Sequence, residues 1–225
     1  MIIVAGIPTG AVVVGIGSRV AMLLLRLTSP QHVHGVISDD GFVIGRFTVG
    51  GSYNLLQIGA VAGIIGALAY RMVSPWLLGP VWLRRLTTGL ASGLVAGSAL
   101  IHPNGVDFTR LKPTWFAIGL FVALPFAFGL LIGAAVDAAR QPDSRTVHGR
   151  RRWLLPLIAI ICFPITILFL VFASAIVVFT TWMRDQAGVQ AVRASRPYGL
   201  VVRTGWLAVA VAGLVALVND ITALA

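Results

Sequence analysis

Long apolar runs separated by short polar segments dominate the pattern along the chain. A run of about 20 apolar residues is long enough to cross the hydrocarbon core of a bilayer as an α-helix. Six membrane spans are predicted on this basis, at about 2–25, 53–73, 86–101, 114–136, 153–180 and 203–219. The pattern therefore predicts an all-α membrane protein, in which residues 1–225 form a single bundle of about six transmembrane helices.

The fifth run, 153–180, is longer than one crossing requires. Tilting or bending would accommodate the excess length, and Pro156 and Pro164 are candidate kink points. After this run, the polar segment 184–202 is predicted to form a short amphipathic helix on the membrane surface.

The segment 36–44 lies between the first two runs. It places Asp40-Gly41 between short apolar stretches, and Asp-Gly in this setting favours a tight hairpin turn. A short β-hairpin outside the bilayer is the favoured interpretation, and an irregular loop is the alternative.

Composition supports the membrane assignment. The chain is 58% hydrophobic and only 11% charged, whereas soluble domains are typically about 25% charged. The net charge of +10 arises from 17 Lys and Arg against 7 acids. In a membrane protein such an excess is typical of cytoplasmic loops and of contact with anionic lipid, so we expect no nucleic-acid partner. Arg150, Arg151 and Arg152, directly before the fifth run, are candidate contacts for anionic lipid head groups.

Orientation depends on how Lys and Arg divide between the two sides. The first, third and fifth loops hold eight of them, namely Arg26, Arg46, Arg110, Lys112, Arg184, Arg193, Arg196 and Arg203. The second and fourth loops also hold eight, namely Arg71, Arg84, Arg85, Arg140, Arg145, Arg150, Arg151 and Arg152. The tie is broken by the loops between the first five spans, where the second and fourth loops lead by eight to four. This places both termini in the cytoplasm.

Small residues recur at helical spacing within the runs. Lipid is as apolar as a leucine side chain, so close backbone approach at Gly and Ala is a main source of helix association in membranes. The glycines with four-residue spacing are Gly59 and Gly63, Gly89, Gly93 and Gly97, and Gly129 and Gly133, with Gly6 and Gly10 in the first run. Packing within the chain is the favoured interpretation, and homodimerisation through the 89–97 face is the alternative.

Arg19 is the charged residue predicted to lie deepest in a span. It precedes the end of the first run by about six residues, and Arg26 follows on the same helix face. One interpretation is that its long side chain reaches the interface or pairs with Asp137 or Asp220. The other is that Arg19 and Arg26 bind an anionic lipid or solute.

Candidate chemistry is sparse. A metal site could be formed by His32 and His34 together with the nearby Asp39 and Asp40, because these residue types bind metals. Their spacing matches no known signature, so solvated histidines are the favoured interpretation. The chain has no P-loop, no H-E-x-x-H and no G-x-S-x-G motif. We therefore predict no catalytic residues, no metal and no cofactor. The single cysteine, Cys162, lies in an apolar run.

Three segments, 15–22, 34–48 and 107–115, resemble a group of uncharacterised multi-pass membrane proteins of actinobacteria. The resemblance covers roughly the first 135 residues. It implies a bacterial plasma membrane and no catalytic residues, because the group has no assigned activity.

Three functions follow as hypotheses. The first is a non-enzymatic protein that acts through helix packing with a partner protein or lipid. The second is a small transporter or channel subunit for an anionic solute, with Arg19 lining a polar cavity. The third is a membrane enzyme on a lipid-linked substrate, which requires Asp39, Asp40, His102 and Asp107 to cluster.

Overall fold

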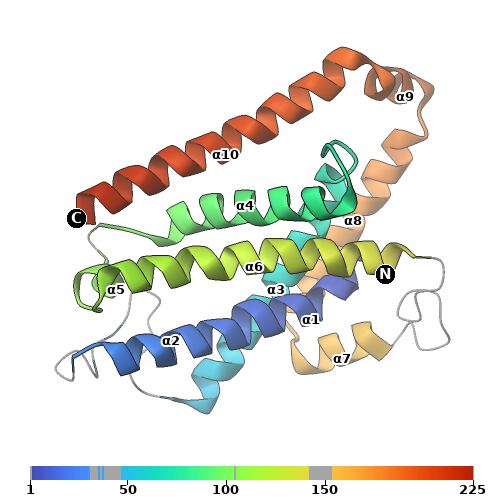
Figure 1. The fold of residues 1–225 in the computed structure, drawn as a ribbon. Coiled ribbons are helices and arrows are strands. Elements are labelled where there is room, and N and C mark those ends of the chain that lie inside the picture. The colour runs from blue at the N-terminus through green and yellow to red at the C-terminus, as the bar shows by residue number, and fades with distance from the viewer. Residues whose placement is uncertain are drawn as a thin grey trace.

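A computed structural model describes residues 2–30, 35, 37, 47–103, 105–141 and 154–224. The regular structure of this part is helical (Figure 1), as the apolar pattern predicts. The histidines His32 and His34, the three arginines 150–152 and, apart from Ile37, the predicted hairpin at 36–44 lie outside the described residues.

The first predicted span forms one helical stretch built from four short segments. These are a 3-10 segment Ile2–Ala5, α1 (Gly6–Gly10), the π-helical segment Ala11–Ile16, and α2 (Gly17–Thr28). The remaining helices are α3 (Val49–Val73), α4 (Val81–Leu100), α5 (Val106–Thr109), α6 (Thr114–Arg140), α7 (Leu154–Cys162), α8 (Thr166–Arg184), α9 (Ala187–Ala194) and α10 (Arg196–Leu224). The helix α9 lies within the segment for which a short helix was predicted.

Five helices in the described part are long and apolar enough to cross a membrane. They are Ile3–Thr28, Val49–Val73, Thr114–Arg140, Thr166–Arg184 and Pro197–Leu224. The chain is thus a multi-pass membrane protein. The third predicted run lies in α4, which is not among the five and which carries Arg84 and Arg85 near its start.

The fifth predicted run is two helices rather than one. Helix α7 ends at Cys162, and α8 begins at Thr166, so Phe163, Pro164 and Ile165 interrupt the helix. Proline lacks a backbone N–H and disfavours the α conformation of the residue before it, which accounts for a break at this position. Tyr53 secures the break, because its hydroxyl donates to the Cys162 carbonyl at 2.8 Å and its ring stacks on Phe163.

The break makes α7 and α8 a hairpin with both outer ends on the same side. In Figure 1, α7 starts near the N-terminus and runs inward, and α8 returns past α3 to the end where α6 finishes. Arg184 at the end of α8 accordingly lies within electrostatic reach of Arg71 at the end of α3. The chain therefore begins and ends at opposite ends of the bundle (Figure 1).

Two apolar clusters fill the bundle. The first joins the N-terminal stretch to α3, α6 and α8, and its members include Ile7, Ile64, Tyr70, Ile132 and Val136. The second joins α2, the α4–α6 connection and α10, and its members include Leu25, Ile101, Phe108, Leu111 and Leu217. By contrast α8 and α10 expose most of their large apolar side chains, as expected of surfaces that face lipid.

The first helical stretch and α3 make the closest helix contact. The backbone at Gly63 meets the backbone at Gly6, and Gly59 meets Gly10, so that a Cβ on Gly63 would overlap the Gly6 carbonyl oxygen. Only glycine permits this approach on both helices.

The other predicted glycines lie between α4, α6 and their neighbours. Gly89 and Gly93 approach Phe126, and Gly97 approaches Val122 of α6. On α6, Gly129 lies against the Thr88–Ser92 turn of α4, while Gly133 lies against Tyr70 and Arg85. All of these contacts are within the chain.

Candidate functional site

Basic residues are concentrated at one end of the bundle, which is called here the arginine end. The helix ends and connections here carry eight arginines, namely Arg71, Arg84, Arg85, Arg140, Arg184, Arg193, Arg196 and Arg203. The opposite end carries three basic residues among those described, namely Arg26, Arg110 and Lys112. Between α6 and α7 the sequence holds four more arginines, and between α2 and α3 it holds one more.

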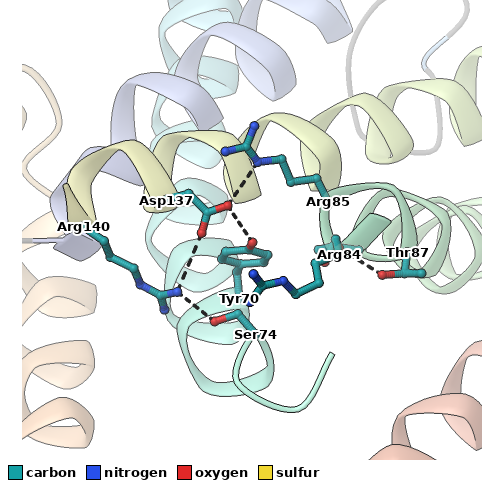
Figure 2. A network of polar contacts seen from close by, with 8 residues as sticks. Tyr70, Ser74, Arg84, Arg85, Thr87, Asp137 and Arg140 are labelled. Carbon is teal, nitrogen blue, oxygen red and sulfur yellow. Dashed lines mark hydrogen bonds and ion pairs between the residues drawn. The ribbon is translucent and has the colours of Figure 1, made fainter. Parts of the chain in front are cut away.

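Asp137, in the last turn of α6, is the centre of a polar network at the arginine end (Figure 2). Its Oδ2 accepts a hydrogen bond from the Tyr70 hydroxyl at 3.0 Å and one from Arg85 Nε at 3.1 Å. Its Oδ1 lies 3.7 Å from Nη1 of Arg140. One carboxylate therefore ties together the ends of α3, α4 and α6.

Arg140 extends the network to the turn after α3. Its Nη1 donates to the Ser74 Oγ at 3.0 Å, and its guanidinium lies 5.8 Å from the centre of the Tyr70 ring. Ser74 and Tyr70 are buried, with 1% and 3% of their surface exposed. Helical spacing accounts for these contacts, because side chains three or four residues apart share one helix face.

Asp137 neutralises only part of the charge around it. Arg84 lies close enough to act electrostatically on Tyr70, and its Nε is buried without a hydrogen-bond partner. Arg71 experiences the like charges of Arg140 and Arg184. Both ion pairs between described residues at this end involve Asp137, so the described part of the arginine end keeps a strong positive excess.

The turn between α3 and α4 connects the network to the start of α10. Arg203 Nε donates to the Trp76 carbonyl at 3.2 Å, and the ring of Tyr198 meets the Trp76 ring edge-on at 5.1 Å. The guanidinium of Arg193 in α9 lies 5.6 Å from the centre of the Trp76 ring. Trp76 therefore fixes α9 and the start of α10 against the same end of the bundle.

The predicted binding residues Arg19 and Arg26 lie away from this network. Arg19, in α2, is half-buried, and its guanidinium lies 5.6 Å from the centre of the Phe47 ring. Asp137, one of its two candidate partners, is paired with Arg85 and Arg140 instead. Arg26 is exposed near the end of α2, one residue after the buried Leu25.

Sequence reasoning singled out Asp137 only as a candidate partner for Arg19 and did not identify its actual network. A signal was present, because Asp137 and the four arginines 71, 84, 85 and 140 all lie at span ends that an up-and-down bundle brings to one side. No comparable pattern in the sequence indicated that Tyr70 and Trp76 would contact these arginines.

The described residues contain no group of three or more His, Cys, Asp or Glu side chains that could hold a metal ion. The Asp107 side chain, Asp39 and Asp40 are not described, so the four-residue cluster required of a lipid-linked enzyme remains a prediction. Comparisons with protein-family models, curated proteins and solved structures find no match to the chain.

Proposed function

We propose that the protein is a non-enzymatic, multi-pass protein of a bacterial plasma membrane that acts by binding anionic lipid at its arginine end. The observation that carries this proposal is the concentration of eight arginine positions on the described backbone at one end, against three basic positions at the other. Each basic residue near an anionic leaflet contributes about 1 kcal/mol of attraction. The resemblance to actinobacterial membrane proteins supports the choice of membrane.

The same imbalance supports an orientation. Lys and Arg next to spans are retained on the cytoplasmic side, so the arginine end is proposed to face the cytoplasm. The N-terminal segment belongs to the same buried cluster as Tyr70 and Val136 and lies at this end. The segment around Leu224 packs in the second cluster at the opposite end, so the proposal that both termini are cytoplasmic is revised to the N-terminus alone.

The other two functions have less support. A transporter or channel for an anionic solute requires a polar path at the depth of Arg19, where the ring contact is with Phe47. A lipid-linked enzyme requires Asp39 and Asp40, which lie outside the described residues. The exposed apolar faces of α8 and α10 could contact a protein partner or a second copy of the chain. No charge pattern on these faces indicates which partner it would be.

The test is lipid selectivity of the purified full chain. Native mass spectrometry in mild detergent compares added phosphatidylglycerol with phosphatidylcholine of the same acyl chains. We expect phosphatidylglycerol to be retained in preference and to raise the thermal midpoint, with both effects weakened by 0.5 M salt in keeping with about a 4–5 Å screening length. Equal retention of the two lipids would refute the proposal.

A further inference from the structure

A cavity that is largely open to its surroundings lies where α8 ends and α9 begins. Its volume is about 500 Å³, and its lining consists of Thr181, Arg184, Asp185, Gln190 and Arg193. Ligand sites in proteins are typically about 300–1,000 Å³, so the space is large enough for a phosphate-bearing head group. The lining contains two guanidinium groups and a primary amide, all of which donate hydrogen bonds.

The charge around the cavity favours an anion. Arg184 has no carboxylate partner among the described residues, because the ion pairs there all involve Asp137. Arg71 lies within electrostatic reach of Arg184 and adds a third positive charge beside the lining. Asp185 supplies one negative charge, which leaves the surroundings positive overall.

Arg193 is held in place before any ligand arrives. Its guanidinium stacks over the Trp76 ring, which also packs against Tyr198. A guanidinium fixed by an aromatic ring loses less side-chain entropy on binding, and its planar fork matches phosphate oxygens. The site is therefore partly preorganised for a phosphate group.

The apolar surroundings match the rest of a lipid. Helix α9 joins α8 to α10, and these two helices run away from it in different directions (Figure 1). Close to α9, α8 exposes Val178, Phe179 and Trp182, and α10 exposes Leu200 and Val201. Acyl chains below a head group in the cavity would lie against such surfaces, whereas a soluble phosphate ester would gain nothing from them.

We propose that this cavity binds the phosphate of an anionic glycerophospholipid, with Arg184 and Arg193 as its ligands and the acyl chains against α8 and α10. The inference rests on the proposed function, which it narrows from a charged end to one discrete site. The proposed ligand is a lipid, and the experiment distinguishes it from a soluble phosphate ester.

The experiment compares matched variants of the full chain in native mass spectrometry with phosphatidylglycerol. The double variant Arg184→Gln, Arg193→Gln removes both proposed ligands, while Arg110→Gln, Lys112→Gln removes two basic residues at the opposite end. We expect the first to weaken binding of the tightest-bound lipid about tenfold, as loss of one to two charge-assisted hydrogen bonds implies, and the second to leave it unchanged. Arg184→Lys, Arg193→Lys keeps the charge and is expected to recover part of the affinity.

The outcomes separate this inference from the general proposal. If wild type prefers phosphatidylglycerol and Arg184→Gln, Arg193→Gln retains the tight lipid, the cavity is not the site but the arginine end still binds lipid. If wild type shows no preference, both proposals fail. Glycerol 3-phosphate is the soluble probe, and its displacement of the lipid at equal concentration would overturn the assignment to a lipid. A thermal midpoint within about 3 °C of wild type shows that the variant is folded.

Discussion

The two ends of the bundle are built from different interactions. At the arginine end, Asp137 links α3, α4 and α6 through Tyr70, Arg85 and Arg140. At the opposite end, the buried side chains of Leu25, Ile101, Phe108, Leu111 and Ala117 pack together. Few charged groups participate there.

A pair of hydrogen bonds at the opposite end also joins neutral groups. The Ser29 hydroxyl, just after α2, donates to the Lys112 carbonyl at 3.3 Å and accepts from the Lys112 N–H at 3.2 Å. This pair fastens α2 to the chain before α6 without using a charged side chain. Among the described residues, the positive charge is therefore concentrated at one end, and the proposals on lipid binding and orientation both concern this end.

The largest expected effect concerns which residues share a side of the membrane. In a Cys162→Ala background, Gln141→Cys and Gln186→Cys test the arginine end, and Thr109→Cys tests the opposite end. All three positions are exposed. We expect an impermeant thiol reagent to label Thr109→Cys in intact cells and to leave Gln141→Cys and Gln186→Cys unlabelled until the cells are opened.

This experiment can also break the hairpin formed by α7 and α8. If the run 153–180 crossed the membrane once, Gln141 and Gln186 would lie on opposite sides. Labelling of one but not the other in intact cells would therefore contradict the hairpin. It would support a single crossing by this run, for which the two sides of the membrane carry equal numbers of Lys and Arg. Labelling of both, with Thr109 protected, would keep the hairpin and reverse the orientation.

The second largest expected effect concerns the contact between Gly63 and Gly6, which holds the N-terminal segment against α3. In Gly63→Ile the new side chain overlaps the Gly6 carbonyl, and two backbones cannot separate without losing the interface. We expect destabilisation of at least about 3 kcal/mol, beyond the usual range for added methylenes, and loss of the monodisperse peak in detergent gel filtration. Gly119→Ile on α6 is the control, because no atom lies within 4 Å of its new Cβ. An unchanged Gly63→Ile peak would contradict the packing.

Helices were the part of the fold most predictable from sequence. Apolar runs place α3 and α6 to within four residues at each end, because lipid requires each span to be apolar and to satisfy its own backbone hydrogen bonds, whereas α10 begins seven residues before the predicted run and ends five residues after it. Pro164 was identified as a candidate kink, and the helix does break beside it. Sequence alone could not show that the kink becomes a reversal, since this depends on how Tyr53, 109 residues away, secures Cys162.

The reversal explains why the charge count by sequence was tied. Arg184, Arg193, Arg196 and Arg203 were assigned to the side opposite Arg71 and Arg140, because one uninterrupted fifth span was assumed. Arg203 instead donates to Trp76, in the turn directly after α3. Of the candidate site, the sequence predicted lipid contacts at the three arginines 150–152, which lie outside the described residues, but not the cavity at α9, since two arginines nine residues apart converge only once α9 forms.

The third effect measures the ionic contribution to the arginine end. Asp137→Asn removes the single charge that balances Arg85 and Arg140, which leaves two guanidinium groups without the carboxylate that they share. Loss of one partner from a buried pair costs about 3–5 kcal/mol, and partial exposure here reduces the expected loss to about 2–3 kcal/mol. Unfolding by SDS titration in mixed micelles measures it. Asp220→Asn at the opposite end, outside any ion pair among the described residues, is expected to cost less than about 0.5 kcal/mol, and equal costs would remove the distinction between the ends.

The smallest effect isolates the hydrogen bond that secures the hairpin. Tyr53→Phe keeps the ring on Phe163 and removes only the hydroxyl that donates to the Cys162 carbonyl. Because 43% of the Tyr53 surface is exposed, we expect a cost of about 0.5–1 kcal/mol, at the low end of the range for a hydrogen bond. Tyr70→Phe, which removes a hydroxyl from the Asp137 network, is the matched comparison. We expect Tyr70→Phe to lower the free energy of unfolding more than Tyr53→Phe does, because Asp137 is charged and Tyr70 is buried. The reverse order would mean that the hydrogen bond at the helix break contributes more to the stability of the bundle than the hydroxyl in the ionic network.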